Sequence, residues 1–281
     1  MQLAKDRVWR IRAFLVEPVI RDQVQLDEQS KRFVFWGVYS ETNQVPWLRL
    51  NAYYFGLNDQ RFSTLNLQRT FSTFGMRLYE IPTKGRLDYE IESVVQTGKL
   101  GNTDHFAHFQ HFDFGYTFDL PWSPRLLIHY DYASGDRNPN DSQSSAFDTL
   151  FGASRRFEFN ATGNFGPFFR RNISSPGWRV IVAPAKGWKV QMLHRFWYLA
   201  TSRGAFAGSG LRDATGGSGN YLGHDLEMRA QWKINDNLEF DAGYNHWFKG
   251  SYFDRLPASA GLPPGGNTDT DYFYFLTKFR V

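Results

Sequence analysis

The chain of 281 residues contains no cysteine. This absence excludes a disulfide-stapled scaffold, a thiol nucleophile, and the zinc or iron–sulfur sites that depend on Cys. The apolar runs are only a few residues long and the mean hydropathy is −0.49, which excludes a transmembrane helix. The first residues also lack the apolar core of a secretory signal. A cytosolic protein, a signal that lies outside this chain, and a piece of a longer protein all stay open.

Aromatic side chains are what the sequence has in abundance: 9 Trp, 14 Tyr and 27 Phe. Together with a hydrophobic content of 42%, they argue against disorder, because such a chain can bury enough surface to offset its ordering entropy. A soluble core normally relies on Leu, Ile and Val. Aromatics mixed with charges instead indicate a surface that is apolar on one side and wet on the other. The net charge of +4 permits an acidic partner without requiring one.

Period-two alternation recurs along the chain, and helical periodicity is nearly absent. Over 225–234, for example, Leu226, Met228 and Trp232 alternate with charged or polar residues. Successive side chains of a strand point to opposite faces, so each segment is predicted to have one apolar face and one charged face. We expect about twelve strands, near 7–17, 32–39, 47–57, 68–79, 86–97, 106–118, 125–133, 177–184, 188–199, 222–234, 238–248 and 271–281.

The predicted connections alternate in length. Short ones, such as 185–187 and 235–237, alternate with long ones near 134–176, 200–221 and 249–270, which are rich in Gly, Ser, Asn, Asp and Pro. Tight turns at one end and long loops at the other are typical of an antiparallel up-and-down transmembrane β-barrel. We therefore predict an all-β fold with a single bacterial outer-membrane barrel domain over 1–281, whose long loops are of the extracellular type.

Two other β architectures compete with this prediction. A lipocalin-like barrel with an apolar interior is disfavoured, because twelve strands would make it too wide for side chains to fill. A soluble two-sheet sandwich could still bury the apolar faces. In the membrane barrel the apolar face meets lipid, and closure leaves no backbone group unpaired in hydrocarbon. Aromatic residues near the strand ends would then lie at the two membrane interfaces: Trp9, Trp36, Trp47, Tyr79, Phe118, Trp122, Trp188, Tyr198, Trp247, Phe248 and Phe279.

The charged face of such a barrel would line a watery lumen. Basic residues outnumber acidic ones at the strand positions of this charged face, which favours an anion path. Guanidinium groups also match carboxylates through two parallel hydrogen bonds. The competing interpretation is that these ions pair across strands and only support the wall. The basic candidates are Arg10, Arg12, Arg49, Arg69, Arg77, Arg125, Arg179, Lys189, Arg195, Arg229, Lys233, Lys278 and Arg280. The acidic ones are Asp88, Glu90, Glu92, Asp131, Asp225, Glu227, Glu239 and Asp241.

The longest predicted loop carries four further arginines: Arg155, Arg156, Arg170 and Arg171. They could contact a polymer outside the pore or fold into the pore as a constriction. Contact with lipopolysaccharide phosphates, or simple solvation, would explain them equally well.

Motifs of enzymes and metal proteins are scarce. His105, His108 and His111 are spaced by three, but on a strand the middle one points away from the outer pair, so a common metal site is not expected. No Gly-x-Ser-x-Gly elbow, phosphate loop or His-Glu-x-x-His motif occurs. We expect no catalytic activity, no cofactor and no nucleic-acid partner.

Several stretches resemble the alginate export family of outer-membrane barrels. The clearest is Tyr130-Asp131-Tyr132-Ala133-Ser134-Gly135-Asp136, a strand end that runs into a long loop. The stretch Phe147-Asp148-Thr149-Leu150-Phe151-Gly152 is similar to the family's Phe-Asn-Pro-Leu-Phe-Pro. Stretches at 35–39, 51–54, 223–227 and 243–250 also fit, so the similarity extends over essentially the whole chain. Thr149 and Gly152 replace prolines, which would loosen that loop.

The resemblance implies a porin-like barrel that passes an acidic, alginate-like polysaccharide or its oligomers, with lumen arginines guiding the uronate carboxylates. It places Asp131 and Asp136 at lumen or loop positions. Outer-membrane lipid, lipopolysaccharide and periplasmic export proteins are the partners expected for such a channel. The family's complete barrels look larger, nearer the roughly 16–18 strands of porins, so a C-terminal fragment is one interpretation. A general anion-selective porin, an outer-membrane enzyme and a soluble carbohydrate-binding module are the alternatives.

Overall fold

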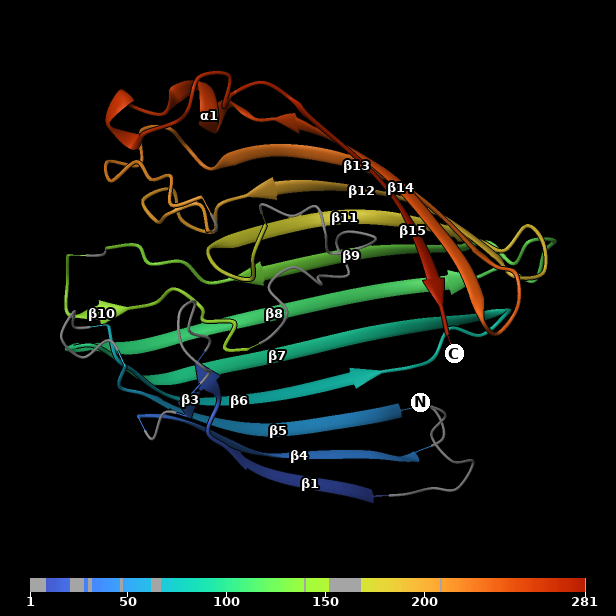
Figure 1. The fold of residues 1–281 in the computed structure, drawn as a ribbon, viewed down its shortest axis with the longest axis horizontal. Helices are drawn as coiled ribbons and strands as arrows, with labels where there is room; N and C mark the ends of the chain where they lie inside the picture. Colours follow the sequence, from blue (N-terminus) through green and yellow to red (C-terminus); the bar gives the residue numbers. More distant parts are fainter. Residues whose placement is uncertain are drawn as a thin grey trace.

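The strands form one large antiparallel sheet in which neighbours in sequence are neighbours in space (Figure 1). The computed structural model describes residues 9–20, 28–29, 32–45, 48–61, 67–138, 140–151, 168–207 and 209–280. The strand order is β1-β4-β5-β6-β7-β8-β9-β11-β12-β13-β14-β15, and the short β10 pairs in parallel with β8 to make the sheet 13-stranded. The long strands are β1 (Trp9–Val16), β4 (Phe33–Val45), β5 (Leu48–Asp59), β6 (Arg69–Tyr79), β7 (Arg86–Leu100), β8 (Thr103–Thr117), β9 (Arg125–Ala133), β11 (Ile173–Val182), β12 (Trp188–Tyr198), β13 (Tyr221–Lys233), β14 (Leu238–Lys249) and β15 (Thr270–Phe279).

The long strands coincide with the segments that alternation predicts, so the all-β, up-and-down prediction is confirmed. The remaining elements lie in the connections and were not predicted. They are β2 (Val19–Ile20), β3 (Glu28–Gln29), β10 (Gln143–Ser144), the helix α1 (Ser251–Arg255) and a 3-10 helix (Ala258–Ala260). One connection at the long-loop end is tight, because β7 and β8 extend until only residues 101 and 102 separate them. Gly101 allows this turn with a left-handed φ of 57°.

The sheet is curved but not closed (Figure 1). The strands β1 and β15 are the two ends of the strand order, and no pairing between them occurs within the described residues. No helix in the described part of the chain is both long and apolar enough to cross a membrane.

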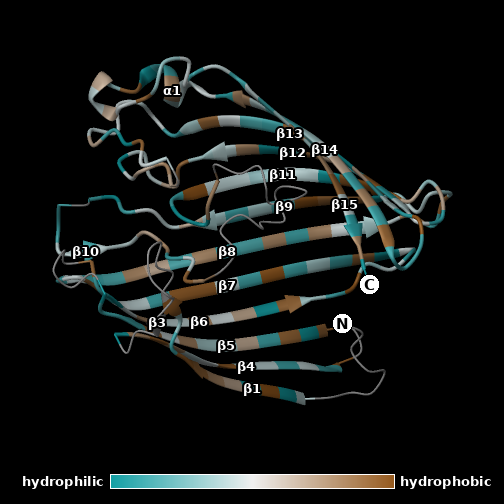
Figure 2. Ribbon diagram, viewed as in Figure 1, coloured by the Kyte–Doolittle hydropathy of each residue, from teal (hydrophilic) through white to brown (hydrophobic). Residues whose placement is uncertain are grey.

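Hydrophobic and hydrophilic residues alternate along many of the strands (Figure 2), and because successive side chains point to opposite faces, the two faces of the sheet differ in chemistry. We call the face that carries the buried carboxylate of Asp131 the inner face, and the opposite face the outer face. In β9, Asp131 and Leu127 are buried, whereas Ile128 between them is 63% exposed. Large hydrophobic side chains are exposed along the outer face from one edge of the sheet to the other, and they include Ile11, Leu15, Phe74, Phe106, Ile128, Met228, Phe273, Phe275 and Phe279.

The inner face is aromatic toward the long loops, which was not predicted. Trp197 and Trp247 are buried there against loop residues, and the ring of Phe168 stacks on Trp197 with centroids 3.8 Å apart. Trp247 was expected at a membrane interface, but it pairs with Asp225 and so shares the inner face. Tyr79 likewise lies inward, paired with Arg49 and Glu90. Of the other residues expected at the interfaces, Trp47 lies outside the described residues.

Candidate functional site: the inner face

The strand register gathers the predicted basic residues on the inner face. One row across the sheet runs from Arg10 through Glu41, Asn51 and Arg77 to Glu92, because partners in an antiparallel pair project to the same side. This row continues through His111 to Asp131. By the same pairing, all the predicted lumen residues within the strands project to the inner face: Arg10, Arg12, Arg49, Arg69, Arg77, Arg125, Asp131, Arg179, Lys189, Arg195, Arg229, Lys233 and Lys278. Arg280 directly follows β15, at a position that continues the inner-face alternation of that strand.

The register also brings in charged residues that reading the sequence missed. It adds Glu41, Asp59 and Asp113 to the acidic set, and Arg86 and Lys249 to the basic set. The excess of bases on the inner face is therefore slightly smaller than the sequence indicates.

Most of the basic residues contact a carboxylate on another strand or in a connection. Arg77 donates to Glu90 at 2.6 Å, and Lys278 contacts Glu239 at 2.8 Å. The other pairs are Arg10 and Arg12 with Glu41, Arg69 with Asp59 and Asp148, Arg125 with Asp88, and Arg229 with Asp241. These pairs tie the sheet together, and Arg10, Arg12 and Lys278 stay partly exposed on the inner face.

Arg195 differs from the rest because it is sealed from solvent. It is only 1% exposed and donates to the carboxylate of Asp131, to the hydroxyl of Ser175 at 3.1 Å and to its carbonyl at 2.9 Å. The second oxygen of Asp131 contacts Nδ1 of His111 at 2.8 Å. A dissolved polymer does not reach this network, so the pathway proposed below omits Arg195 and Asp131.

Four of the predicted bases are clearly exposed on the inner face: Arg12, Lys189, Lys233 and Arg280. Lys189 is the second residue of β12 and Arg280 follows β15, both beside short turns. Lys233 contacts Asp236 in such a turn at 2.6 Å. Arg49 and Arg179 are half-buried near the same end of the sheet. The accessible positive charge therefore lies mainly toward the short turns, opposite the aromatic region.

The three histidines of β8 alternate between the two faces of the sheet. His105 and His111 lie on the inner face and His108 on the outer face, as the alternation predicts. Within the described residues, no three His, Asp or Glu side chains gather as a metal site. Arg155 and Arg156 lie outside the described residues. Arg171 is exposed beside residues 147–150 of the connection between β9 and β11, and Asp136 is half-buried in the loop after β9.

A segment of the β9–β11 connection, Phe147–Phe151, crosses the inner face and is pinned to it. The side chain of Gln96 on β7 accepts from the backbone N–H of Asp148 at 2.9 Å and donates to its carbonyl at 2.8 Å. Arg69 holds the Asp148 carboxylate at 3.0 Å. Leu150 in the middle of the segment has a left-handed φ of 54°, a costly conformation for a non-glycine residue that the surrounding contacts must maintain.

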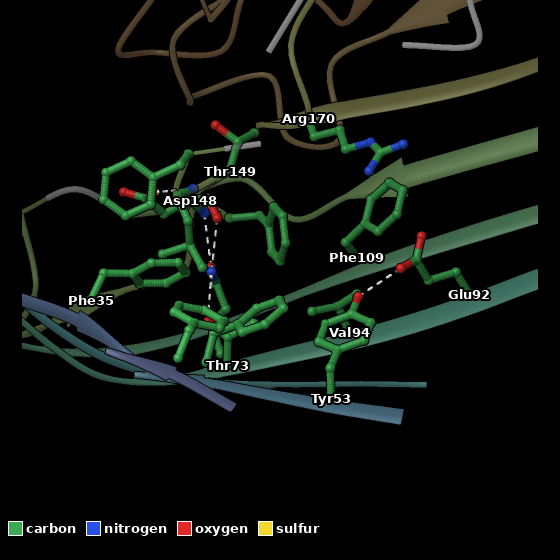
Figure 3. Close-up of a pocket in the computed structure, with 15 residues that line it drawn as sticks. Phe35, Tyr53, Thr73, Glu92, Val94, Phe109, Asp148, Thr149 and Arg170 are labelled. Atoms are coloured by element: carbon green, nitrogen blue, oxygen red, sulfur yellow. Dashed lines mark hydrogen bonds between the residues drawn. The ribbon is translucent and has the colours of Figure 1, made fainter. Parts of the chain in front are cut away.

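A cavity of about 460 Å³ lies between this segment and the inner face of the sheet (Figure 3). We call it the aromatic cavity. Seven aromatic rings contribute to its walls, together with three charged residues. It is lined by Phe14, Phe35, Tyr53, Phe55, Thr73, Glu92, Val94, Gln96, Phe109, Phe147, Asp148, Thr149, Leu150, Phe151 and Arg170. A second cavity, of about 370 Å³, lies on the other side of the segment and is lined in part by Arg69, Arg171 and Phe206.

Two glycines create the room in which the rings of the aromatic cavity lie. A Cβ at Gly75 would be 2.1 Å from the ring of Tyr53, and a Cβ at Gly37 would be 2.5 Å from the ring of Phe55. The rings therefore lie directly over the backbone of the neighbouring strand. The hydroxyl of Tyr53 donates to Glu92 at 2.6 Å, and the guanidinium carbon of Arg170 lies 4.5 Å from the centroid of the Phe109 ring. Five lining residues belong to the stretch 147–152 that resembles the family motif, and Phe35 and Tyr53 lie in two further stretches of that resemblance. None of these stretches, nor the inward parity of the aromatics, predicts that they enclose a cavity.

The chain was compared with curated proteins, solved structures and protein families. No curated protein matches the chain. Among solved structures, the NanC porin aligns over 97% of this chain and 99% of its own, with 6% sequence identity and a TM-score of 0.39. The family model described as "Alginate export" matches residues 1–261. The chain therefore belongs to the alginate export family.

Proposed function

We propose that this protein is an outer-membrane channel through which an acidic polysaccharide, or its oligomers, passes along the inner face of the sheet. The observation that carries the proposal is the asymmetry of the two faces. Ionised side chains line the inner face, and exposed Phe, Leu, Ile and Met side chains cover the outer face. A spanning sheet in a bilayer needs this arrangement, with apolar residues toward lipid and polar residues toward water. Membership of the alginate export family supports the choice of a polysaccharide as the solute.

The mechanism is electrostatic. Ion pairs such as Arg77 with Glu90 hold the wall and fix its charges in place, whereas Arg12, Arg49, Lys189 and Arg280 present positive charge to the bore. Positive charge lowers the cost of moving carboxylates through a narrow aqueous path. Several separated bases, rather than one deep site, let a polyanion move from contact to contact and leave.

Ion selectivity in a planar bilayer tests this proposal. We expect the wild-type channel to prefer anions, and the triple variant Arg49→Gln, Lys189→Gln, Arg280→Gln to shift the zero-current potential in a salt gradient toward that of a non-selective pore. Lys99→Gln is a matched control, because Lys99 lies on the outer face and contacts Asp104 near the tight turn. An unchanged potential in the triple variant would remove the proposed role of these bases.

A second measurement separates a channel from an outer-membrane enzyme. Uronate oligomers should reduce the single-channel ion current while they occupy the bore, and should be recovered with unchanged length. Shortened oligomers without current block would favour the enzyme.

A further inference from the structure

Two neighbouring rings that line the aromatic cavity have nearly parallel planes. The rings of Tyr53 and Phe55 have centroids 4.9 Å apart and an interplanar angle of 21°. Tyr39, next to the cavity, stacks on Tyr53 at 5.8 Å and 11°. Their faces carry the negative part of the aromatic quadrupole. A pyranose ring presents weakly positive C–H groups on its two faces, so a sugar and a flat ring attract each other face to face.

Arg170 and Glu92 lie at the end of the cavity that holds Phe109 and Tyr53, whereas Asp148 and Thr149 lie toward Phe35 at the other end (Figure 3). The guanidinium of Arg170 is placed over Phe109, and Glu92 receives the hydroxyl of Tyr53. A guanidinium is the group best shaped to bind a carboxylate through two hydrogen bonds. The Glu92 carboxylate can accept from sugar hydroxyls but repels a uronate carboxylate, so the two charges orient a uronate ring with its acid toward Arg170.

The cavity has the dimensions of a ligand site. At about 460 Å³ this cavity falls within the range of roughly 300–1,000 Å³ that small-molecule sites occupy, and it combines apolar walls with a few convergent polar groups.

We propose that the aromatic cavity is a sugar-binding site within the bore, in which Tyr53 and Phe55 stack against pyranose rings of the acidic polysaccharide and Arg170 binds a uronate carboxylate. The proposal rests on the channel function proposed above and adds a defined contact point to it. Two classes of interaction meet in the site: stacking recognises any sugar with a C–H face, and Arg170 discriminates acidic from neutral sugars.

Current block by oligosaccharides tests the site with the full chain in a planar bilayer. We expect a uronate hexamer to block the wild type, and Phe55→Leu to raise its half-blocking concentration about three- to tenfold, because leucine retains apolar volume but has no ring face. Phe55→Tyr keeps the ring, so the half-blocking concentration of the uronate hexamer should be that of the wild type. Phe74→Leu is the matched control, since Phe74 is an outer-face ring on the adjacent strand and is 51% exposed.

The charged residues are tested by comparing the uronate hexamer with a neutral glucose hexamer. Arg170→Gln should weaken block by the uronate hexamer and leave block by the neutral hexamer unchanged. Glu92→Gln should strengthen block by the uronate hexamer, since it removes the opposing charge and retains an acceptor for the Tyr53 hydroxyl.

The outcomes distinguish the site from the channel. If the uronate hexamer blocks Phe55→Leu and Arg170→Gln at the same concentration as the wild type, the sugar-binding site is overturned and the channel function is unaffected. A wild type that neither conducts anions nor responds to uronate overturns the channel function itself. Heat-dependent migration on a gel verifies that each variant is folded, and Tyr53→Leu serves as the second stacking variant where Phe55→Leu does not fold.

Discussion

At the scale of single residues, the inner face separates charges that hold the wall from charges that face the bore. Arg195 and Asp131 are both 1% exposed or less, and each is the other's ionic partner. Arg12 contacts Glu41 at 3.1 Å, yet its side chain is 47% exposed. A buried ion pair costs much to break, because it leaves an uncompensated charge, whereas an exposed pair contributes little.

The first prediction concerns this difference in stability. Arg195→Ala should lower the free energy of unfolding by about 3–5 kcal/mol, and Arg12→Ala by about 0–1 kcal/mol. Urea unfolding in lipid vesicles, followed by tryptophan fluorescence, measures both. Adding Asp131→Asn to Arg195→Ala should recover part of the loss; a double variant that is no better than Arg195→Ala would show that the ion pair is not the cause.

A second prediction concerns acid and the loop that carries Asp213, outside the strands. The Asp213 carboxylate accepts from the Thr215 hydroxyl at 2.7 Å and from the backbone N–H and hydroxyl of Ser218, both at 2.8 Å. The hydrogen bonds from Thr215, followed by those from Ser218, lower the pKa of Asp213 well below its ordinary value. A carboxyl with a depressed folded pKa stabilises the fold above its unfolded pKa of about 3.9 and loses that contribution as the pH falls toward the folded value.

We therefore expect the loop over 209–220 to loosen as the pH falls below about 4, and to be insensitive to pH between about 5 and 7. Hydrogen–deuterium exchange of this loop, corrected for intrinsic exchange rates, measures the effect. In Asp213→Asn the loop should be looser at neutral pH and should lose most of the acid dependence. An acid dependence that Asp213→Asn retains would assign it to another group.

How far the sequence predicts the site is clearest at this scale. The inward parity of Arg77 and Lys278 follows from period-two alternation alone. Their partners do not, because the contact of Arg77 with Glu90 depends on the register between β6 and β7. The contact of Arg69 with Asp148 requires a loop folded onto the face, which no local pattern shows.

At the scale of elements, alternation predicted every long strand but not the structure of the long connections. Strand β4 continues to Val45, beyond the predicted end at 39, and β7 and β8 meet in a tight turn. The connection that contains β10 and Phe147–Phe151 is shaped by contacts with β6, β7 and β8, such as those of Gln96, and these tertiary contacts outweigh local propensity.

The third prediction tests whether Gln96 holds the segment Phe147–Phe151 in place. Gln96→Leu removes both of its hydrogen bonds to the Asp148 backbone and leaves buried polar groups unsatisfied, at a cost of about 1–3 kcal/mol. In a Thr149→Cys background, the labelling rate of the thiol should then rise at least about fivefold. Gln110→Leu is the control, since Gln110 donates to Ser93 at 3.0 Å on the outer face. Equal labelling in both variants would show that Gln96 does not hold the segment.

At the scale of the whole molecule, the two edge strands need partners. Open sheet edges do not occur in the hydrocarbon of a bilayer. Strands alternate in direction along the order, so β1 and β15 are antiparallel, and both carry exposed apolar outer-face residues such as Ile11 and Phe275. These features favour closure of the sheet on itself in the membrane.

The fourth prediction follows from that closure. Because the chain has no cysteine, Ile11→Cys can be combined with a single Cys at 273, 275 or 277. We expect one of these pairs to form an intramolecular disulfide in vesicles, seen as altered migration on a non-reducing gel. Disulfide-linked dimers in place of the monomer would show instead that the edges pair with a second copy.

The central claim is that the outer face meets lipid and the inner face meets water. Single cysteines introduced at Phe74, Ile128 and Met228 on the outer face, and at Arg49, Lys189 and Arg280 at inner-face positions, test it directly in vesicles. A lipid-soluble maleimide should label the first set, and a charged, membrane-impermeant thiol reagent should label the second. Labelling of the first set by the charged reagent, with protection of the second, would contradict the account.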